Sequence, residues 1–164
     1  MPVKPRGRGP DDLLELDNQL CFALHATTRR VIRAYQQALA DLDLTYPQYL
    51  VMLVLWGWDR ARVAQPTVSA LGARLDLDSG TLTPLLRRLE QKGVLVRTRS
   101  PEDGRALFVR TTPAGRAMKQ RAARVPMAML EHSPLPLEEI IALRNQLQRL
   151  RAALPWHESF SAPA

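Results

Sequence analysis

The segment 78–111, DSGTLTPLLRRLEQKGVLVRTRSPEDGRALFVRT, constrains the fold more than any other part of the chain. Lys92 and Gly93 are typical of a helix end, since glycine accepts the left-handed conformation that often closes a helix. The runs 94–99 and 106–111 predict two short strands, and the SPEDG sequence between them favours a turn. The residues before Lys92 predict a helix with one apolar face, because four leucines recur at helical spacing: Leu82, Leu85, Leu86 and Leu89.

Charge and polarity in this segment favour contact with a nucleic acid. Residues 78–110 carry seven Arg and Lys against four Asp and Glu. A polar helix start beside a basic hairpin suits DNA, since the helix can read base edges while the hairpin holds the backbone or the minor groove. The alternative is an ordinary α+β fragment with solvated charges. The candidate DNA-binding residues lie at the helix start and in the first strand: Ser79, Thr81, Thr83, Arg87 and Arg99.

The residues just before this segment predict the other half of a helix-turn-helix. The triplet TVS at 67–69 is typical of a helix start, and a short helix is expected to reach Leu75. Asp78 is then the N-cap of the second helix. Pro84 lies inside that helix, where its missing N–H is expected to bend the first turns without ending the helix. Residues 47–111 are therefore predicted to form a helix-turn-helix with a wing.

An apolar stripe before this unit predicts a long first helix over 11–43, about eight turns in length. A second, nearly apolar helix over 47–59 is expected to be buried. Its tryptophans, Trp56 and Trp58, fit core or interface packing better than a ligand platform.

The region 112–154 is predicted to add two more helices. Thr112 and Pro113 have the chemistry of a helix start, and this helix is expected to fade at Pro126 or near His132. A last amphipathic helix is expected over 136–154. The fold class is thus mainly α with a small β wing.

The first and last helices carry apolar stripes that the winged unit does not need. Their natural partner is the same pair of helices in a second copy, so 11–43 and 112–154 are predicted to form the dimerisation region. A symmetric dimer presents two recognition helices to two half-sites, which suits a pseudo-palindromic operator in double-stranded DNA.

Composition limits the remaining classes of function. A net charge of +7 and an isoelectric point near 10.5 favour a polyanionic partner. One cysteine excludes an intramolecular disulfide, and three scattered histidines show no metal-ligand spacing, so no cofactor is expected. The basic start shows no secretory signal and no run spans a bilayer, so a cytoplasmic protein without membrane contact is expected. Residues 1–10 are expected to be a flexible basic arm, and 155–164 a flexible tail.

The single cysteine, Cys21, lies within the apolar stripe of the first helix. Most lone helix cysteines are small buried hydrophobic residues. Because Cys21 lies about ten residues from the expected helix start, the helix dipole is not expected to activate it.

Two tyrosines change this assessment if the chain dimerises. Tyr35 follows Cys21 by fourteen residues, on nearly the same face but about 21 Å away along the helix. The two residues cannot touch within one straight helix, but they can meet across a two-fold axis where first helices cross. Tyr46 can join them there. Two phenol hydroxyls donated to one sulfur would stabilise a thiolate.

Several motifs together resemble the MarR-type winged-helix repressors, and within them the organic-hydroperoxide sensors of the OhrR kind. They are LDNQLCFALHATTRRVIRAYQ, LTYPQYLVMLVLW, DSGTLTPLLRRLEQKGVLVRTRSPEDGRA and TTPAG. The first two motifs are specific to the peroxide-sensing branch, and the wing marks the broader family. The resemblance covers roughly residues 16–150, so a MarR-type domain is expected over 11–154.

The resemblance implies roles for individual residues. Cys21 matches the peroxide-reactive cysteine, and Tyr35 and Tyr46 match the tyrosines that hydrogen-bond its thiolate from the opposite subunit. In the wing, Asp103 matches an aspartate that orients an arginine, and Arg105 matches the arginine that enters the minor groove. The second, resolving cysteine of some sensors is missing, which implies capture of the oxidised sulfur by an outside low-molecular-weight thiol or overoxidation.

The sequence therefore predicts a homodimeric repressor, not an enzyme, that releases its operator when an organic hydroperoxide oxidises Cys21. One alternative is a MarR-type repressor controlled by a non-covalent aromatic ligand, with Cys21 inert. A second is a thiol peroxidase, although no arginine or threonine lies within five residues of Cys21 in sequence to activate a peroxide. Metal sensing is the weakest alternative.

Overall fold

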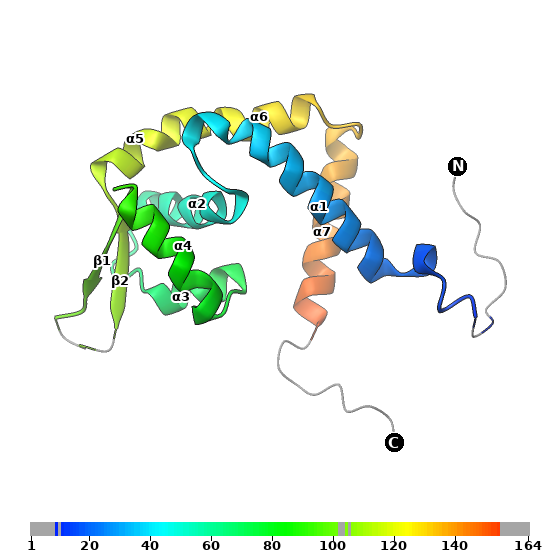
Figure 1. The fold of residues 1–164 in the computed structure, drawn as a ribbon, viewed down its shortest axis with the longest axis horizontal. Coiled ribbons are helices and arrows are strands. Elements are labelled where there is room, and N and C mark those ends of the chain that lie inside the picture. The colour runs from blue at the N-terminus through cyan, green and yellow to red at the C-terminus, as the bar shows by residue number, and fades with distance from the viewer. Residues whose placement is uncertain (1–8, 10, 102–103, 105, 155–164) are drawn as a thin grey trace, which may run out of the picture.

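The computed structural model describes residues 9, 11–101, 104 and 106–154. These residues form seven α-helices, two 3-10 turns and one antiparallel hairpin (Figure 1). The elements follow in the order η1 (Leu16–Asn18), α1 (Leu20–Ala38), η2 (Ala40–Leu42), α2 (Tyr46–Ala61), α3 (Val68–Leu75), α4 (Ser79–Gln91), β1 (Leu95–Arg99), β2 (Leu107–Thr111), α5 (Pro113–Ala122), α6 (Arg124–Glu131) and α7 (Leu137–Ala153). The predicted fold class, mainly helical with a β wing, is confirmed.

The hydrophobic core lies inside the winged unit, where α2 packs between α3, α4, α5 and the hairpin. The predicted buried helix over 47–59 is α2, and it supplies four fully or almost fully buried apolar side chains, Val51, Met52, Leu55 and Trp56. The Trp56 indole N–H donates to the carbonyl of Gly115 at 2.8 Å. This bond joins α2 to α5 inside the core, so Trp56 is a packing residue, as its sequence context indicates.

The recognition helix α4 begins and packs as its sequence predicts. Asp78 is the N-cap, and its carboxylate accepts from the Thr81 backbone N–H at 2.8 Å. The helix continues through Pro84. The Thr83 hydroxyl, one residue earlier, donates to the Ser79 carbonyl at 2.7 Å. The inner face of α4 is completely buried through Leu82, Leu86 and Leu89.

The wing pairs in a simple antiparallel register, from Leu95 opposite Thr111 to Arg99 opposite Leu107. The chain before α3 extends this small sheet, since the Val109 N–H donates to the carbonyl of Pro66 at 2.8 Å. Strand β2 therefore has a hydrogen-bonded neighbour on each side, β1 on one and residues 66–67 on the other.

The N-terminal helix is shorter than predicted. Residues 11–43 do not form one helix: α1 begins at Leu20 and ends at Ala38, and Gln19 is extended, with φ −85° and ψ 114°. The side chains of Asn18 and Gln19 turn back and donate to the carbonyls of Asp12 and Leu13. Side-chain hydrogen bonds of this kind compete with helical ones, so an apolar stripe alone does not extend the helix through this segment.

The helix predicted from Thr112 is divided in two. The Thr112 side chain caps α5 as expected, but α5 ends at Ala122 and α6 begins at Arg124. Pro126 is the cause: it cannot donate to the carbonyl four residues earlier, and its ring collides with that carbonyl. At the start of α6 a proline is tolerated, so Pro126 lies inside α6, which ends beside His132.

The outer helices α1 and α7 have no buried residues within one chain. Figure 1 shows α1 running away from the winged unit and α7 descending from the end of α6 past α1. Large apolar side chains on both helices are exposed: Leu20, Phe22 and Val31 on α1, and Leu137, Ile141, Leu143 and Leu147 on α7.

Candidate DNA-binding surface and redox site

The predicted DNA-binding residues of the recognition helix share its exposed face. Ser79, Thr81, Thr83 and Arg87 are exposed, while the leucines on the opposite side of α4 are buried. This face begins at the N-terminus of α4, the positive end of the helix dipole, which favours contact with a phosphate. The helix is therefore held rigidly from behind and presents hydroxyls and a guanidinium outward.

The N-cap also orients one of these hydroxyls. The Thr81 Oγ1 donates to the Asp78 carboxylate at 3.0 Å. The hydrogen bonds from the Thr81 backbone and side chain lower the pKa of Asp78 below its ordinary value. Asp78 therefore stays charged and keeps Thr81 in a single orientation.

The wing carries one further predicted residue within the described chain. Arg99 is exposed at the end of β1. Asp103 and Arg105 lie outside the described residues. The structure adds an ion pair that sequence reasoning missed: Arg97 donates from Nη2 and Nε to Glu90 at 2.6 and 3.1 Å, and so ties β1 to α4. The hydrogen bonds from Arg97 lower the pKa of Glu90.

Cys21 is exposed and lies near the start of α1. The expectation that it sits far from the helix start is wrong, since α1 begins at Leu20 and Cys21 is its second residue. The reason is the extended Gln19, which interrupts the predicted helix. Within one chain Cys21 is also not the buried hydrophobic residue that a lone helix cysteine usually is.

The predicted tyrosines meet each other within one chain. The ring centroids of Tyr35 and Tyr46 are 4.7 Å apart, although the residues belong to α1 and α2. Tyr49 completes the cluster at 6.0 Å from Tyr35, and its ring meets Trp56 at 6.4 Å. Sequence reasoning missed Tyr49, although its spacing of three residues from Tyr46 on one helix could have indicated it.

Burial raises the pKa of all three tyrosines above the ordinary value of 10.0, and mutual repulsion among the rings' charged forms adds to the effect for Tyr35 and Tyr49. The phenols are therefore neutral donors throughout the physiological range. Cys21 is not part of this cluster within the chain, because Tyr35 lies fourteen residues further along α1, about 21 Å away.

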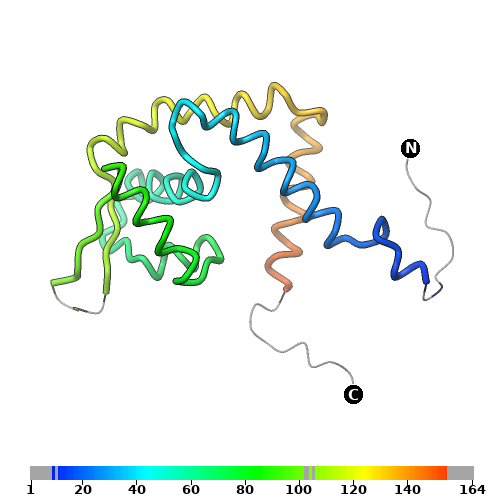
Figure 2. The backbone as a smooth tube through the Cα atoms, viewed as in Figure 1, coloured from blue at the N-terminus to red at the C-terminus, as the bar shows by residue number. Residues whose placement is uncertain are grey.

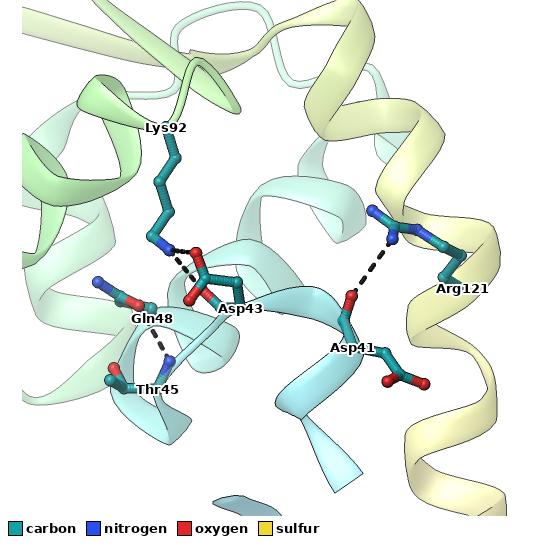
Figure 3. Close-up of polar contacts among 6 residues, drawn as sticks. All are labelled: Asp41, Asp43, Thr45, Gln48, Lys92 and Arg121. Carbon is teal, nitrogen blue, oxygen red and sulfur yellow. Dashed lines mark hydrogen bonds and ion pairs between the residues drawn. The ribbon is translucent and has the colours of Figure 1, made fainter.

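Polar contacts connect the segment between α1 and α2 to the DNA-binding unit (Figure 3). Lys92, the C-cap of α4, forms an ion pair with Asp43 and also donates to its carbonyl. On the other side, Arg121 of α5 donates to the carbonyl of Asp41 at 3.3 Å. The recognition helix is thus attached directly to the connection that follows the cysteine-bearing helix.

A largely apolar cavity of about 440 Å³, open to solvent, lies between helices α1 and α7. Tyr46 lies in its wall, so the cavity reaches the tyrosine cluster. The helices contribute apolar residues on both sides: Leu24, Val31 and Ile32 from α1, and Ile140, Leu143 and Leu147 from α7.

Two other classes of site are missing from the described part of the chain. No group of three His, Cys, Asp or Glu residues there is arranged to hold a metal ion. None of the helices described is both long and apolar enough to cross a membrane.

Comparison with known proteins identifies the relatives of this chain. Residues 33–122 match the family model of the SarA/Rot transcriptional regulators. The chain is 40% identical over 143 residues to the organic hydroperoxide resistance transcriptional regulator of Bacillus subtilis, covering 87% of this chain and 94% of that protein.

Solved structures agree with this relationship. The overoxidized form of AbfR, a protein of Staphylococcus epidermidis, bound to DNA is similar with a TM-score of 0.70 and 32% identity, covering 89% of this chain and 100% of that one. CouR from Rhodococcus jostii RHA1, bound to p-coumaroyl-CoA, is similar with a TM-score of 0.67 and 25% identity, covering 88% and 99%.

Proposed function

The chain belongs to the MarR-type winged-helix transcriptional regulators, in the branch related to the organic hydroperoxide regulator, and on this premise we propose a peroxide-released repressor. It is a DNA-binding regulator whose relatives are regulators rather than enzymes. In our proposal it acts as a homodimer on a pseudo-palindromic operator. Oxidation of Cys21 by an organic hydroperoxide then releases the DNA.

The exposed face of α4 supports the DNA-binding part of this proposal. Thr81, Thr83 and Arg87 meet base edges in the major groove, while Ser79 lies at the helix N-terminus beside a phosphate. Arg99 and the wing pair Asp103 and Arg105 contact the backbone and the minor groove. The net charge of +7 favours a strongly salt-dependent association.

The exposed apolar faces of α1 and α7 support the dimer. Helix α7 has no buried residue, and Leu143 and Leu147 are 46% and 36% exposed within one chain. Such stripes are stable in water only when another surface covers them. A second copy offers the same two helices and forms a closed two-fold assembly.

The tyrosine cluster is the observation that carries the redox part. Two neutral phenols, Tyr35 and Tyr46, lie 4.7 Å apart but are remote from Cys21 of their own chain. Crossing of the two α1 helices in the dimer brings Cys21 of one copy to the phenols of the other. There their hydroxyls donate to the sulfur and stabilise the thiolate.

The chemical step is a two-electron oxidation of this sulfur. The Cys21 thiolate attacks the terminal oxygen of the hydroperoxide, the O–O bond breaks, and the alkoxide leaves and takes up a proton as the alcohol. The sulfenate that remains is a different hydrogen-bond acceptor for Tyr35 and Tyr46. A low-molecular-weight thiol then condenses with the sulfenic acid, which releases water and forms a mixed disulfide.

Lys92 and Asp43 provide a route from this reaction to the DNA. A mixed disulfide at the start of α1 wedges the dimer helices apart, and the connection after α1 moves with them. Because Lys92 is bound to Asp43 in that connection, the recognition helix is displaced as well. The spacing between the two recognition helices then no longer matches the two half-sites.

Operator binding before and after peroxide, with and without Cys21, tests the proposal. The wild-type protein is expected to bind the operator when reduced and to release it after treatment with an organic hydroperoxide. Cys21→Ser is expected to bind equally well and to stay bound after treatment. Release of Cys21→Ser by peroxide would contradict the proposal.

The second candidate function is control by a non-covalent aromatic ligand. The apolar cavity of about 440 Å³ between α1 and α7, together with the ligand-bound CouR relative, favours it. Titration of aromatic acids and thioesters against the operator complex of Cys21→Ser separates the two functions, because only this second function predicts release without the cysteine.

A further inference from the structure

We propose that the acidic, leucine-rich segment 11–17 of one copy docks in the groove between α2 and α5–α6 of its partner copy. This inference rests on the dimer of the proposed function, in which Cys21 of one copy meets Tyr46 of the other. It adds a specific contact that would hold the reactive end of α1 in place.

The segment has the sequence DDLLELD, with four carboxylates and no basic residue. Its leucines are strongly exposed within one chain: Leu13, Leu14 and Leu16 by 71%, 82% and 58%. The segment nevertheless has a defined shape, because Asn18 donates to the carbonyl of Asp12 at 2.8 Å and Gln19 donates to that of Leu13. Figure 2 shows it at the end of the molecule opposite the wing, away from the core.

The groove has the complementary composition. It has a volume of about 280 Å³, and its apolar wall includes Leu53, Trp56 and Pro126. Two cations, Arg60 of α2 and Lys119 of α5, also line it. Among the described residues neither side chain has a hydrogen bond or ion pair, and Leu53 is 44% exposed. The groove therefore offers apolar surface and two positive charges to an apolar segment whose four carboxylates form no ion pair with any described residue.

The lengths agree with this placement. Tyr46 begins α2 and Arg60 follows fourteen residues later, which corresponds to about 21 Å along the helix. Asp12 precedes Cys21 by nine residues, which span about 14 Å when helical, and the long Arg60 and Lys119 side chains can cover the remaining distance. With Cys21 beside the partner's Tyr46, a segment antiparallel to the partner's α2 brings its carboxylates to Arg60 and Lys119.

Disulfide trapping in the full-length chain tests the contact directly. In a Cys21→Ser background, Leu14→Cys combined with Leu53→Cys is expected to form a covalent dimer on mild oxidation. The matched control combines Leu14→Cys with Val96→Cys, since Val96 on the wing is 42% exposed, almost the same as Leu53. The control is expected to give several-fold less covalent dimer. Equal yields, or no cross-link with Leu53→Cys, would overturn the docking.

Charge reversal gives an independent measurement. Arg60→Glu with Lys119→Glu is expected to raise the dimer dissociation constant by about two- to fivefold for each ion pair lost. Adding Asp11→Lys and Asp12→Lys is expected to restore it. If the fourfold variant dimerises as weakly as Arg60→Glu with Lys119→Glu, the docking is also overturned.

The outcomes for docking and for the proposed function are distinguishable. If both docking tests fail but the dimer still releases its operator on oxidation of Cys21, only the docking proposal is wrong. If the cysteine pair cross-links but the wild-type protein does not respond to peroxide, the docking proposal is supported and the proposed peroxide response is wrong.

Discussion

Lys92 at the end of the recognition helix donates a hydrogen bond to the carbonyl of Asp43 at 2.5 Å and forms an ion pair with its carboxylate. The two residues are 49 positions apart in the sequence. Asp43 lies in the connection between α1 and α2, where its backbone is left-handed, with φ 52°. One lysine thus joins the DNA-binding helix to the chain that leaves the helix bearing Cys21.

Asp43→Ala is expected to lower the free energy of unfolding by about 1–2 kcal/mol, because alanine is strained in the left-handed conformation. Asp43→Asn is the matched control: asparagine tolerates this conformation and loses only the charge of an exposed pair, for about 0.5 kcal/mol. Urea denaturation of the two variants measures the difference. Equal stabilities would show that the backbone conformation of residue 43 is unimportant.

Tyr35→Phe and Tyr46→Phe are each expected to slow oxidation of Cys21 by roughly tenfold, since each removes a proposed hydrogen bond to the sulfur. Operator affinity of the reduced proteins is expected to stay unchanged. Tyr49→Phe serves as the control, because its ring belongs to the same cluster but is only 3% exposed. Stopped-flow measurement of sulfenate formation provides the rates. Wild-type rates in both variants would refute activation by the tyrosines.

Glu90→Gln is expected to destabilise the protein by about 1 kcal/mol at neutral pH, because it weakens the partly exposed bidentate contact with Arg97. The pKa of Glu90 is lowered in the folded protein by Arg97. Its stabilising charge is therefore fully present above the ordinary value of 4.5 and is lost as the pH falls through the lower, folded value.

Urea midpoints of wild type and Glu90→Gln are expected to converge as the pH falls from 7 toward 3. A difference that stays constant over this range would mean that the carboxylate charge is not what anchors the wing. Glu131→Gln, at an exposed position, controls for the general effect of removing a carboxylate.

Gly115→Ala is expected to destabilise the fold by about 3 kcal/mol. An added Cβ would lie 1.9 Å from the backbone carbonyl oxygen of Val94, so α5 would have to move away from the wing. Gly57→Ala is the matched control, because its Cβ would meet nothing within 4 Å inside α2. Helix propensity then predicts a gain of about 0.5–1 kcal/mol. Thermal unfolding of both variants checks the opposite signs.

Arg99→Ala is expected to weaken binding to all DNA sequences alike and to reduce the salt dependence, because it removes a proposed phosphate contact. Thr81→Val is expected instead to change the preference among operator variants. Arg149→Ala, on the exposed surface of α7, is the charge-matched control. Fluorescence anisotropy at several salt concentrations separates these effects; an unaltered salt slope in Arg99→Ala would exclude its phosphate contact.

The winged helix-turn-helix could be read from the sequence because local signals define it. The Asp78 cap, the leucine spacing of α4 and the turn chemistry of the wing each act over a few residues, and the structure confirms the cap, the helix and the pairing of the two strands. The tyrosines Tyr35 and Tyr46 could be singled out by their position relative to Cys21 in a dimer and by the family resemblance. Their roles and that of Cys21 stay predictions, since these depend on a second copy.

Tertiary structure decided what depends on contacts between distant residues or on competition among hydrogen bonds. The extended Gln19 places Cys21 in the first turn of α1, because amide side chains, and not the apolar stripe, satisfy the preceding carbonyls. The addition of Tyr49 to the cluster and the bond from Lys92 to Asp43 join segments that no periodicity connects. Sequence patterns report the local preferences of the backbone, whereas such contacts form only when the packed core brings distant segments within a few ångströms of each other.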